Sequence, residues 1–328
     1  MKKLVVALLV SVSAVANAET LTILTDRPAV RLQPLVEQFK KEKGVDVIVV
    51  EKAYADMETQ LVAEGTAPTA DLIYIKDLVL LDKAVKKDLF QPLTNASVKS
   101  RVLPAMKDHN DLWVAVSYRA RTLVYDASRV DVSDIKSYED LADSKFAGRI
   151  CLRTSGGTYN VALIANLVVN KGETAAKDIF AGILSNLATD VFKNDTLMMQ
   201  AIATGVCDIG IANTYYLGQA VAANPNFPVK PLFVNQDSTG VHTNGTGVGV
   251  VKYSQKAALA QEFIALMLSD SAQLHLSSQH MEYPAAVGLT PNTLIADWGT
   301  FKVDAANWSI VGEQVPAAER IIKELDYK

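Results

Sequence analysis

This chain of 328 residues lacks the short motifs of the common hydrolases and metalloenzymes. It contains no His-Glu-x-x-His, no Cys-x-x-Cys and no Gly-x-Ser-x-Gly. Its histidines show no metal-ligand spacing; they are His109, His242, His275 and His280. An enzyme would need a nucleophile–base pair or a strongly perturbed acid, and no local pattern indicates either one. We therefore predict that the chain is not an enzyme.

The chain also lacks an excess of positive charge. It has 32 Lys and Arg against 36 Asp and Glu, which gives a formal net charge of −4. Nucleic acids and anionic membranes attract proteins that carry a basic patch. The charge balance therefore argues against a nucleic-acid partner, and it leaves contact with a membrane only through membrane proteins.

Long apolar runs are missing after the start of the chain, where one short run is present. Lys2 and Lys3 precede an apolar stretch from Leu4 to Val15, and Ala16-Asn17-Ala18 follows as a small-residue cleavage site. This order is typical of a secretory signal peptide over residues 1–18, and the run is too short for a membrane span. Without Lys2 and Lys3 the net charge falls from −4 to −6. We expect a soluble protein exported to the bacterial periplasm.

Cysteine is nearly absent, with only Cys151 and Cys207. In an oxidising compartment two cysteines predict one disulfide, Cys151–Cys207. In the chain-entropy model, closing this loop stabilises the fold by roughly 4 kcal/mol. The alternative is two unpaired buried thiols.

The remaining chain of about 310 residues is too long for a single core, which predicts two lobes. Residues 21–24, 45–50 and 71–75 have strand patterns with amphipathic helical segments between them, which is typical of a parallel, right-handed α/β lobe. Short strands at 112–117 and 122–125 flank Tyr118-Arg119-Ala120-Arg121. No flexible linker is present, so the chain is expected to cross between lobes more than once, at 117–125 and 243–251. The predicted parts are 1–18 as signal peptide, 19–118 plus 246–300 as the N-terminal lobe, and 119–245 plus 301–328 as the C-terminal lobe.

Three segments follow one plan: a strand, a polar turn, and the start of a helix. They are Leu24 with Asp26 and Arg27, Arg153 with Ser155 to Tyr159, and Ala212 with Tyr215 and Tyr216. In a doubly wound sheet such turns lie at the carboxyl edge of the strands, where ligands bind. A disulfide between the strands that feed the last two turns would bring Tyr159 within reach of Tyr215 and Tyr216.

Three clustered phenols suggest a metal site. A phenol has a pKa near 10, so it ligates only a cation strong enough to displace its proton. Hard oxygen ligands suit a hard, highly charged ion, and Fe³⁺ is the obvious candidate. The alternative is that Tyr215 and Tyr216 are aromatic side chains that pack under a helix.

Candidate anion-binding groups accompany the tyrosines. Ser155-Gly156-Gly157-Thr158 before a helix offers exposed N–H groups, although an ordinary helix cap has the same pattern. Arg27, Arg119 and Arg121 are able to bind an anion through two N–H groups each. Gly245-Thr246-Gly247-Val248-Gly249 lacks the spacing of a dinucleotide motif and indicates a hinge or close packing.

Several motifs occur together in an order that is specific for one family. They are Thr25-Asp26-Arg27-Pro28, Tyr118-Arg119-Ala120-Arg121, Cys151-x-Arg153-x-Ser155 with Tyr159-Asn160, Asn213-Thr214-Tyr215-Tyr216, and Glu282-Tyr283-Pro284. In these motifs the chain resembles, over essentially its whole mature length, the periplasmic ferric-ion-binding proteins of ATP-binding-cassette iron importers. Where some members have a histidine ligand in the first turn, this chain has Asp26-Arg27-Pro28. Where others have a carboxylate ligand after the third strand, it has Lys76.

The resemblance implies a type II periplasmic-binding-protein fold, with two lobes of mixed sheet flanked by helices. It implies Fe³⁺ bound by Tyr159, Tyr215 and Tyr216, with carbonate or another anion held by Arg119 or Arg121 and with Arg27 as a further anion contact. It also implies a monomer that delivers iron to an inner-membrane permease with its ATPase. Two other hypotheses remain open: a binding protein of the same fold for a small anion or organic solute (thiamine, a phosphonate or a polyamine), and a structural envelope protein.

Overall fold

The structure is a computed structural model, and it describes residues 19–328. The predicted signal peptide, residues 1–18, lies outside the described residues. Among residues 19–328, no helix combines the length and the hydrophobicity that a membrane span requires.

The described chain alternates strands and helices. The strands are β1 (Thr20–Thr25), β2 (Asp46–Glu51), β3 (Leu72–Ile75), β4 (Phe90–Gln91), β5 (Val114–Asp126), β6 (Ile150–Cys151), β7 (Ile209–Asn213), β8 (Val229–Leu232), β9 (Thr243–Val251) and β10 (Tyr283–Pro284). The α-helices are α1 (Gln33–Lys43), α2 (Tyr54–Glu64), α3 (Leu78–Lys86), α4 (Ala96–Arg101), α5 (Thr158–Lys171), α6 (Glu173–Ser185), α7 (Asp195–Ala203), α8 (Thr214–Ala223), α9 (Ala257–Met267), α10 (Asp270–His280), α11 (Thr293–Ala296), α12 (Trp308–Glu313) and α13 (Val315–Glu324). Short 3₁₀ helices lie at Ala29–Arg31, Pro104–Met106, Glu139–Ala142 and Ser144–Phe146.

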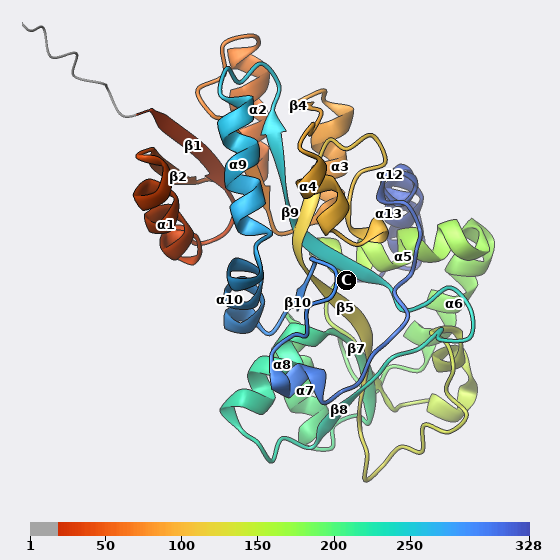
Figure 1. The fold of residues 1–328 in the computed structure, drawn as a ribbon. Coiled ribbons are helices and arrows are strands. Elements are labelled where there is room, and N and C mark those ends of the chain that lie inside the picture. Colours follow the sequence, from red (N-terminus) through yellow and green to blue (C-terminus); the bar gives the residue numbers. More distant parts are fainter. Residues whose placement is uncertain (1–18) are drawn as a thin grey trace, which may run out of the picture.

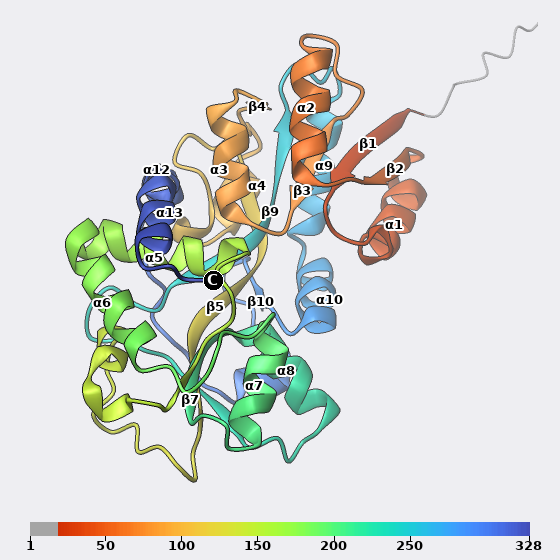
Figure 2. The same ribbon diagram turned by 180° about the vertical axis from the view of Figure 1, so that it is seen from behind.

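The strands form one mixed sheet in the order β2-β1-β3-β9-β5-β7-β6, with β10 and β8 paired to β5 and β4 paired to β9. Figure 1 shows β1 and β2 with α1, α2 and α9 at one end of the molecule and β7 and β8 with α7 and α8 at the other. The long strands β5 and β9 run between the two ends, and the reverse view in Figure 2 shows the same arrangement. The prediction of a mixed sheet flanked by helices is confirmed.

The first three strands form the parallel unit that the sequence predicts. β1 pairs in parallel with both β2 and β3, through α1 and α2 as crossovers. Every residue of β3 is buried, as its continuous apolar run requires for a central strand. α1 ends at Gly44, which takes a left-handed φ of 69° that suits glycine.

The sequence predicts two short strands around Tyr118-Arg119-Ala120-Arg121, and this prediction is wrong. β5 is a single strand from Val114 to Asp126. Its first half pairs with β9 and its second half with β7 and β8, so different partners satisfy its backbone along its length. The polar residues that interrupt the apolar pattern lie where the strand passes from one set of partners to the next.

The glycines of β9 allow other elements to approach closely. A Cβ on Gly247 would lie 2.5 Å from Leu81 Cδ1 of α3 and 2.9 Å from the Val114 carbonyl oxygen of β5. A Cβ on Gly245 would lie 2.8 Å from the Ser117 carbonyl oxygen. All three distances are shorter than van der Waals contact, so these glycines serve close packing, one of the two predicted roles.

The predicted disulfide between Cys151 and Cys207 is present, with a Cα–Cα distance of 5.9 Å and a sequence separation of 56. Cys151 lies in β6 and Cys207 precedes β7, and these two strands pair in parallel. The bond therefore joins the strands that lead to Tyr159 and to the Tyr215–Tyr216 pair.

Removing this disulfide tests its contribution to stability. For the double variant Cys151→Ala, Cys207→Ala we expect the free energy of unfolding to fall by roughly 2–4 kcal/mol, because the unfolded chain regains the entropy of an open loop. Urea denaturation followed by circular dichroism measures this difference. An unchanged midpoint and slope would show that the disulfide contributes nothing to the free energy of unfolding.

Candidate functional site

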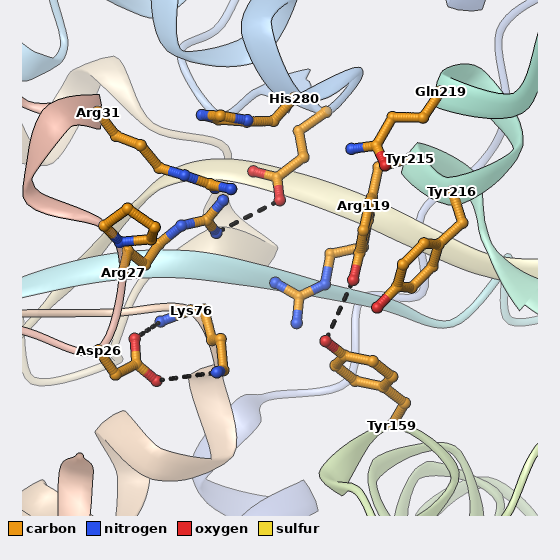
Figure 3. Close-up of a pocket in the computed structure, with 12 residues that line it drawn as sticks. Asp26, Arg27, Arg31, Lys76, Arg119, Tyr159, Tyr215, Tyr216, Gln219 and His280 are labelled. Atoms are coloured by element: carbon orange, nitrogen blue, oxygen red, sulfur yellow. Dashed lines mark hydrogen bonds and ion pairs between the residues drawn. The ribbon is translucent and has the colours of Figure 1, made fainter. Parts of the chain in front are cut away.

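Polar side chains from distant segments gather in a pocket of about 290 Å³. The three predicted strand–turn–helix segments all contribute: Asp26 and Arg27 follow β1, Tyr159 lies in the first turn of α5, and Tyr215 and Tyr216 lie in the first turn of α8. Figure 3 shows the three tyrosines on one side of the pocket and the side chains from the β1 end on the other. The predicted convergence of these turns is therefore present.

The backbone at the start of α8 aims both phenols at one space. Asn213 ends β7, and Thr214 begins the helix with its side-chain oxygen accepting a hydrogen bond from the Ala120 N–H of β5 at 3.2 Å. Adjacent residues on a regular helix diverge by about 100°, yet at this turn the rings of Tyr215 and Tyr216 lie 4.1 Å apart, centre to centre. This turn therefore allows adjacent phenols to face one pocket.

The phenol of Tyr159 reaches the pair from α5. Its oxygen lies 3.1 Å from the Tyr215 oxygen, within hydrogen-bond distance. The rings of Tyr159, Tyr215 and Tyr216 are partly buried, and all three line the pocket. Three phenol oxygens from two helices thus face a common space.

Burial and mutual proximity hold the phenols of Tyr215 and Tyr216 in the neutral form. Burial, with the neighbouring phenol of Tyr159 next in importance, raises the pKa of Tyr215 far above its usual value of 10. Burial also raises the pKa of Tyr216, again with Tyr159 as the next cause. Both groups are therefore protonated at neutral pH, and a cation bound there as a phenolate complex must displace their protons.

Arg119 of β5 points into the same pocket with free hydrogen-bond donors. Its side chain is only 2% exposed, and its Nε and Nη1 have no hydrogen-bond partner in the described residues. The closest carboxylate is Asp77, 4.0 Å from Nη2, and Asp77 already accepts bonds from Thr158, Asn244 and the Val79 N–H. A buried guanidinium with unpaired donors is costly unless an anion accepts from it.

The other charged groups of the pocket are partly neutralised in pairs. Arg27 Nη1 lies 3.4 Å from Glu282 Oε1, and Lys76 Nζ lies 3.7 Å from Asp26 Oδ2. Burial of Glu282 raises the pKa of its carboxyl group, but the nearby charge of Arg27 helps to lower that pKa below its usual value. The Glu282 carboxylate is therefore charged. Arg31 and Arg119 stand outside these two pairs, so the pocket has a surplus of positive charge.

Two of the predicted anion-binding residues lie elsewhere. Arg121 is 1% exposed, and its donors bond to Asn160 (2.7 Å), Asp195 (3.2 Å), Asn213 (3.1 Å) and the Ile211 carbonyl (3.3 Å). It is therefore a buried structural group. The Ser155 N–H donates to the Lys328 carbonyl at 2.6 Å and its hydroxyl to the Tyr327 carbonyl at 2.9 Å. These bonds occupy both polar groups of Ser155 that could hold an anion, its N–H and its hydroxyl.

The pocket also contains residues that the sequence did not identify as site residues. They are Arg31, Gln219, His280 and Glu282. Gln219 lies four residues after Tyr215 on α8, so helical spacing was a usable signal for it. His280 ends α10, and Glu282 follows a left-handed turn at Met281 with a φ of 54°. Nothing in the local pattern indicates that this turn faces the β1 end of the sheet.

The donor set favours a hard, highly charged cation together with an anion. Among the described residues no group of three His, Cys, Asp or Glu side chains is placed to hold a metal ion. The carboxylates of Glu282 and Asp26 are already paired with Arg27 and Lys76, which leaves the phenols as the oxygens that this pocket offers a cation. Oxygen-only donors suit hard ions. Three phenolates balance a charge of 3+, which leaves the surplus guanidinium charge for an anion.

Comparison with known families gives one match over most of the chain. The family described as "Bacterial extracellular solute-binding protein" matches residues 34–302. "Iron uptake protein A1" of a Synechocystis strain is 32% identical over 304 residues, which cover 90% of this chain and 83% of that protein. The "Fe(3+)-binding periplasmic protein" of Serratia marcescens is 28% identical over 282 residues, covering 83% of this chain and 81% of that protein.

Solved structures show the same likeness in three dimensions. The Trichodesmium protein IdiA (FutA), solved in complex with iron and citrate ligands, superposes with a TM-score of 0.89 at 30% identity. The match covers 94% of this chain and 100% of that one. These relatives and this neighbour are named for iron uptake or for binding iron.

Proposed function

The chain belongs to the bacterial extracellular solute-binding protein family, in the group of the ferric-iron-binding proteins, and from this membership we propose that it binds Fe³⁺ in the periplasm for import. One observation carries the proposal: the Tyr159 and Tyr215 oxygens lie 3.1 Å apart and Tyr216 lines the same pocket. We assign these three residues as the iron ligands. Their phenolates neutralise the ion, which removes most of the cost of enclosing it in a low-dielectric site.

An anion completes the site in this proposal. Arg119 is its holder, because two of its buried nitrogens have no partner among the described residues. Arg27 and Arg31 face the phenols from the β1 end and add positive charge there. The opposite side of the pocket thus contributes anion-binding charge, and oxygens of the anion or of water fill the remaining iron coordination positions.

The lobes of the proposal are residues 19–118 plus 246–300 and residues 119–245 plus 301–328. Pairing of β5 first with β9 and then with β7 and β8 supports β5 as a crossing between them. The second proposed crossing is β9. The pocket is lined by residues of both proposed lobes, so closure of the lobes about β5 and β9 would enclose the iron.

We further propose that the protein is exported and passes its iron to an importer in the inner membrane. Residues 1–18 act as a cleaved signal peptide, and the mature chain works as a monomer. It is a binding protein rather than an enzyme, and it delivers iron to an inner-membrane permease with its ATPase. Membership of an extracellular solute-binding family supports export of the chain and a role in solute binding.

Iron titration tests the proposed function. Apo protein titrated with Fe³⁺ supplied as a weak chelate is expected to turn red-orange, with a visible phenolate-to-iron absorption band that saturates at one equivalent and bleaches with citrate in excess or with dithionite. A protein that stays colourless and binds no iron would favour the same fold with a small anion or organic solute as its ligand. Titration with thiamine, a phosphonate and a polyamine then identifies which class it takes.

Iron affinity is expected to rise with pH. Because Tyr215 and Tyr216 are protonated at neutral pH, with pKa values raised by burial, each must lose a proton when iron binds. Each released proton makes the apparent affinity rise about tenfold per pH unit, or about 100-fold per unit for the two together. Competition against a chelator of known pH dependence measures this slope, and a pH-stat counts the released protons directly. Iron binding without proton release would exclude these two phenols as ligands.

A further inference from the structure

The hydroxyl of Tyr327 joins the last residues of the described chain to the segment that carries Tyr159. Tyr327 follows α13, is 5% exposed, and packs its ring 6.2 Å from that of Phe180 in α6. Its hydroxyl accepts a hydrogen bond from Asn160 Nδ2 and donates one to the Arg153 carbonyl. Figures 1 and 2 both show α13 beside α5, and the two helices are in contact.

The first of these bonds orients the first turn of α5. Asn160 is the residue after Tyr159 and is 1% exposed. Its Oδ1 accepts from Arg121 Nε at 2.7 Å, so its amide is fixed on both sides, by Tyr327 and by Arg121. The Arg121 guanidinium in turn lies 5.8 Å from the centre of the Tyr159 ring. Rotation of Tyr159 about the helix start therefore disturbs this chain of buried bonds.

The second bond orients the strand end that leads into α5. Tyr327 holds the Arg153 carbonyl, and the Arg153 guanidinium lies 4.8 Å from the centre of the Tyr159 ring, at cation–π distance. Two residues further on, Ser155 bonds to the carbonyls of Tyr327 and Lys328. Hydrogen bonds to Tyr327 and Lys328 thus anchor the turn between β6 and α5 to the segment that follows α13. Without these bonds, Gly156 and Gly157 would leave this turn mobile.

We propose that Tyr327 is a positioning residue for Tyr159: its hydroxyl sets the place of that phenol opposite Tyr215 by fixing Asn160 and Arg153 on either side of it. This inference rests on the proposed function, in which Tyr159 is an iron ligand. Burial raises the pKa of Tyr327 to about 12, so its hydroxyl stays protonated and able to donate to the carbonyl. A metal site needs each ligand held to within about 0.5 Å, which requires such support from residues behind it.

The test compares Tyr327→Phe with Tyr54→Phe. Tyr327→Phe keeps the ring and removes only the hydroxyl, whereas Tyr54→Phe removes a buried hydroxyl of α2 that has no partner among the described residues. In iron-loaded Tyr327→Phe we expect the visible band to shift in wavelength and the rate of iron loss to excess citrate to rise about tenfold, in line with measured losses after removal of groups that support metal ligands. Tyr54→Phe is expected to match the wild type in both.

A measurement on the apo protein separates positioning from iron binding. With ¹³C-labelled tyrosine, the ring signal of Tyr159 is assigned by its absence in Tyr159→Phe. We expect that signal to shift and broaden in Tyr327→Phe and to stay in place in Tyr54→Phe. An unmoved signal, or iron loss no faster than in the wild type, overturns the proposal even if the protein binds iron. A moved signal in a protein that binds no iron supports the positioning role and rejects the proposed function instead.

The double variant Asn160→Ala, Tyr327→Phe tests whether Tyr327 acts on Tyr159 through Asn160. Asn160→Ala removes the partner through which Tyr327 acts on the helix, so its effect on iron loss and that of Tyr327→Phe should be less than additive. Full additivity would show that the two residues act independently, and it would overturn the proposed path through Asn160.

Discussion

Tyr215→Phe is expected to weaken and shift the visible phenolate-to-iron band and to make the protein lose iron more readily to a competing chelator. The Tyr215 oxygen lies 3.1 Å from that of Tyr159, in a partly buried position where the variant leaves no replacement ligand. Losing one phenolate also leaves one positive charge of the ion unmatched, which costs on the order of 3–5 kcal/mol in a buried pair. That corresponds to a fall in affinity of roughly a hundred- to a few thousandfold. Citrate competition followed by absorbance measures both effects.

Two further variants make this test specific. Tyr216→Phe is expected to have the same effect, because its ring centre lies 4.1 Å from that of Tyr215 and it lines the same pocket. Tyr253→Phe serves as the control, since this tyrosine is 44% exposed and follows β9 away from the pocket. If Tyr215→Phe and Tyr216→Phe both keep the wild-type spectrum, the ligand assignment is wrong.

Arg119→Gln is expected to abolish the dependence of iron retention on the accompanying anion. In the wild type, carbonate or citrate should slow iron loss at low concentration, because the Arg119 Nε and Nη1 are buried donors without partners among the described residues. A charge-assisted hydrogen bond contributes about 1.5–3 kcal/mol, so losing it should weaken anion binding by roughly ten- to a hundredfold. Titration of each anion into the iron-loaded protein, followed by the shift of the visible band, measures this loss.

The stability of the apo protein gives an independent measurement for the same variant. Removing a buried guanidinium with two nitrogens that lack partners in the described part of the chain should leave the unfolding midpoint of the apo protein unchanged or raise it, because its desolvation cost disappears. Arg320→Gln is the control: Arg320 is an exposed arginine of α13 that pairs with Glu173 at 2.9 Å and does not line the pocket. A large loss of apo stability in Arg119→Gln, with anion binding intact, would show that Arg119 is a structural group like Arg121.

The sequence alone determined the elements and the kinds of groups at the site. Strand and helix periods are local properties of the chain, so the sequence predicts β1, β2 and β3 close to their observed bounds, with helices between them. The placement of Tyr215 and Tyr216 between a strand and a helix is local too, and the disulfide follows from there being only two cysteines. Parallel strands end at one edge of a sheet, which was enough to predict that the three turns converge.

Only the tertiary structure decided which arginine faces the pocket. Arg119 and Arg121 are two apart on β5, and residues two apart on a strand point to the same face. The difference comes from their surroundings. Asn160, Asp195 and Asn213 from three other segments surround Arg121, whereas two nitrogens of Arg119 have no partner within residues 19–328. Likewise, Ser155 bonds to Tyr327 and Lys328 from the far end of the chain. Such contacts depend on which segments the fold brings together, and no local pattern contains that information.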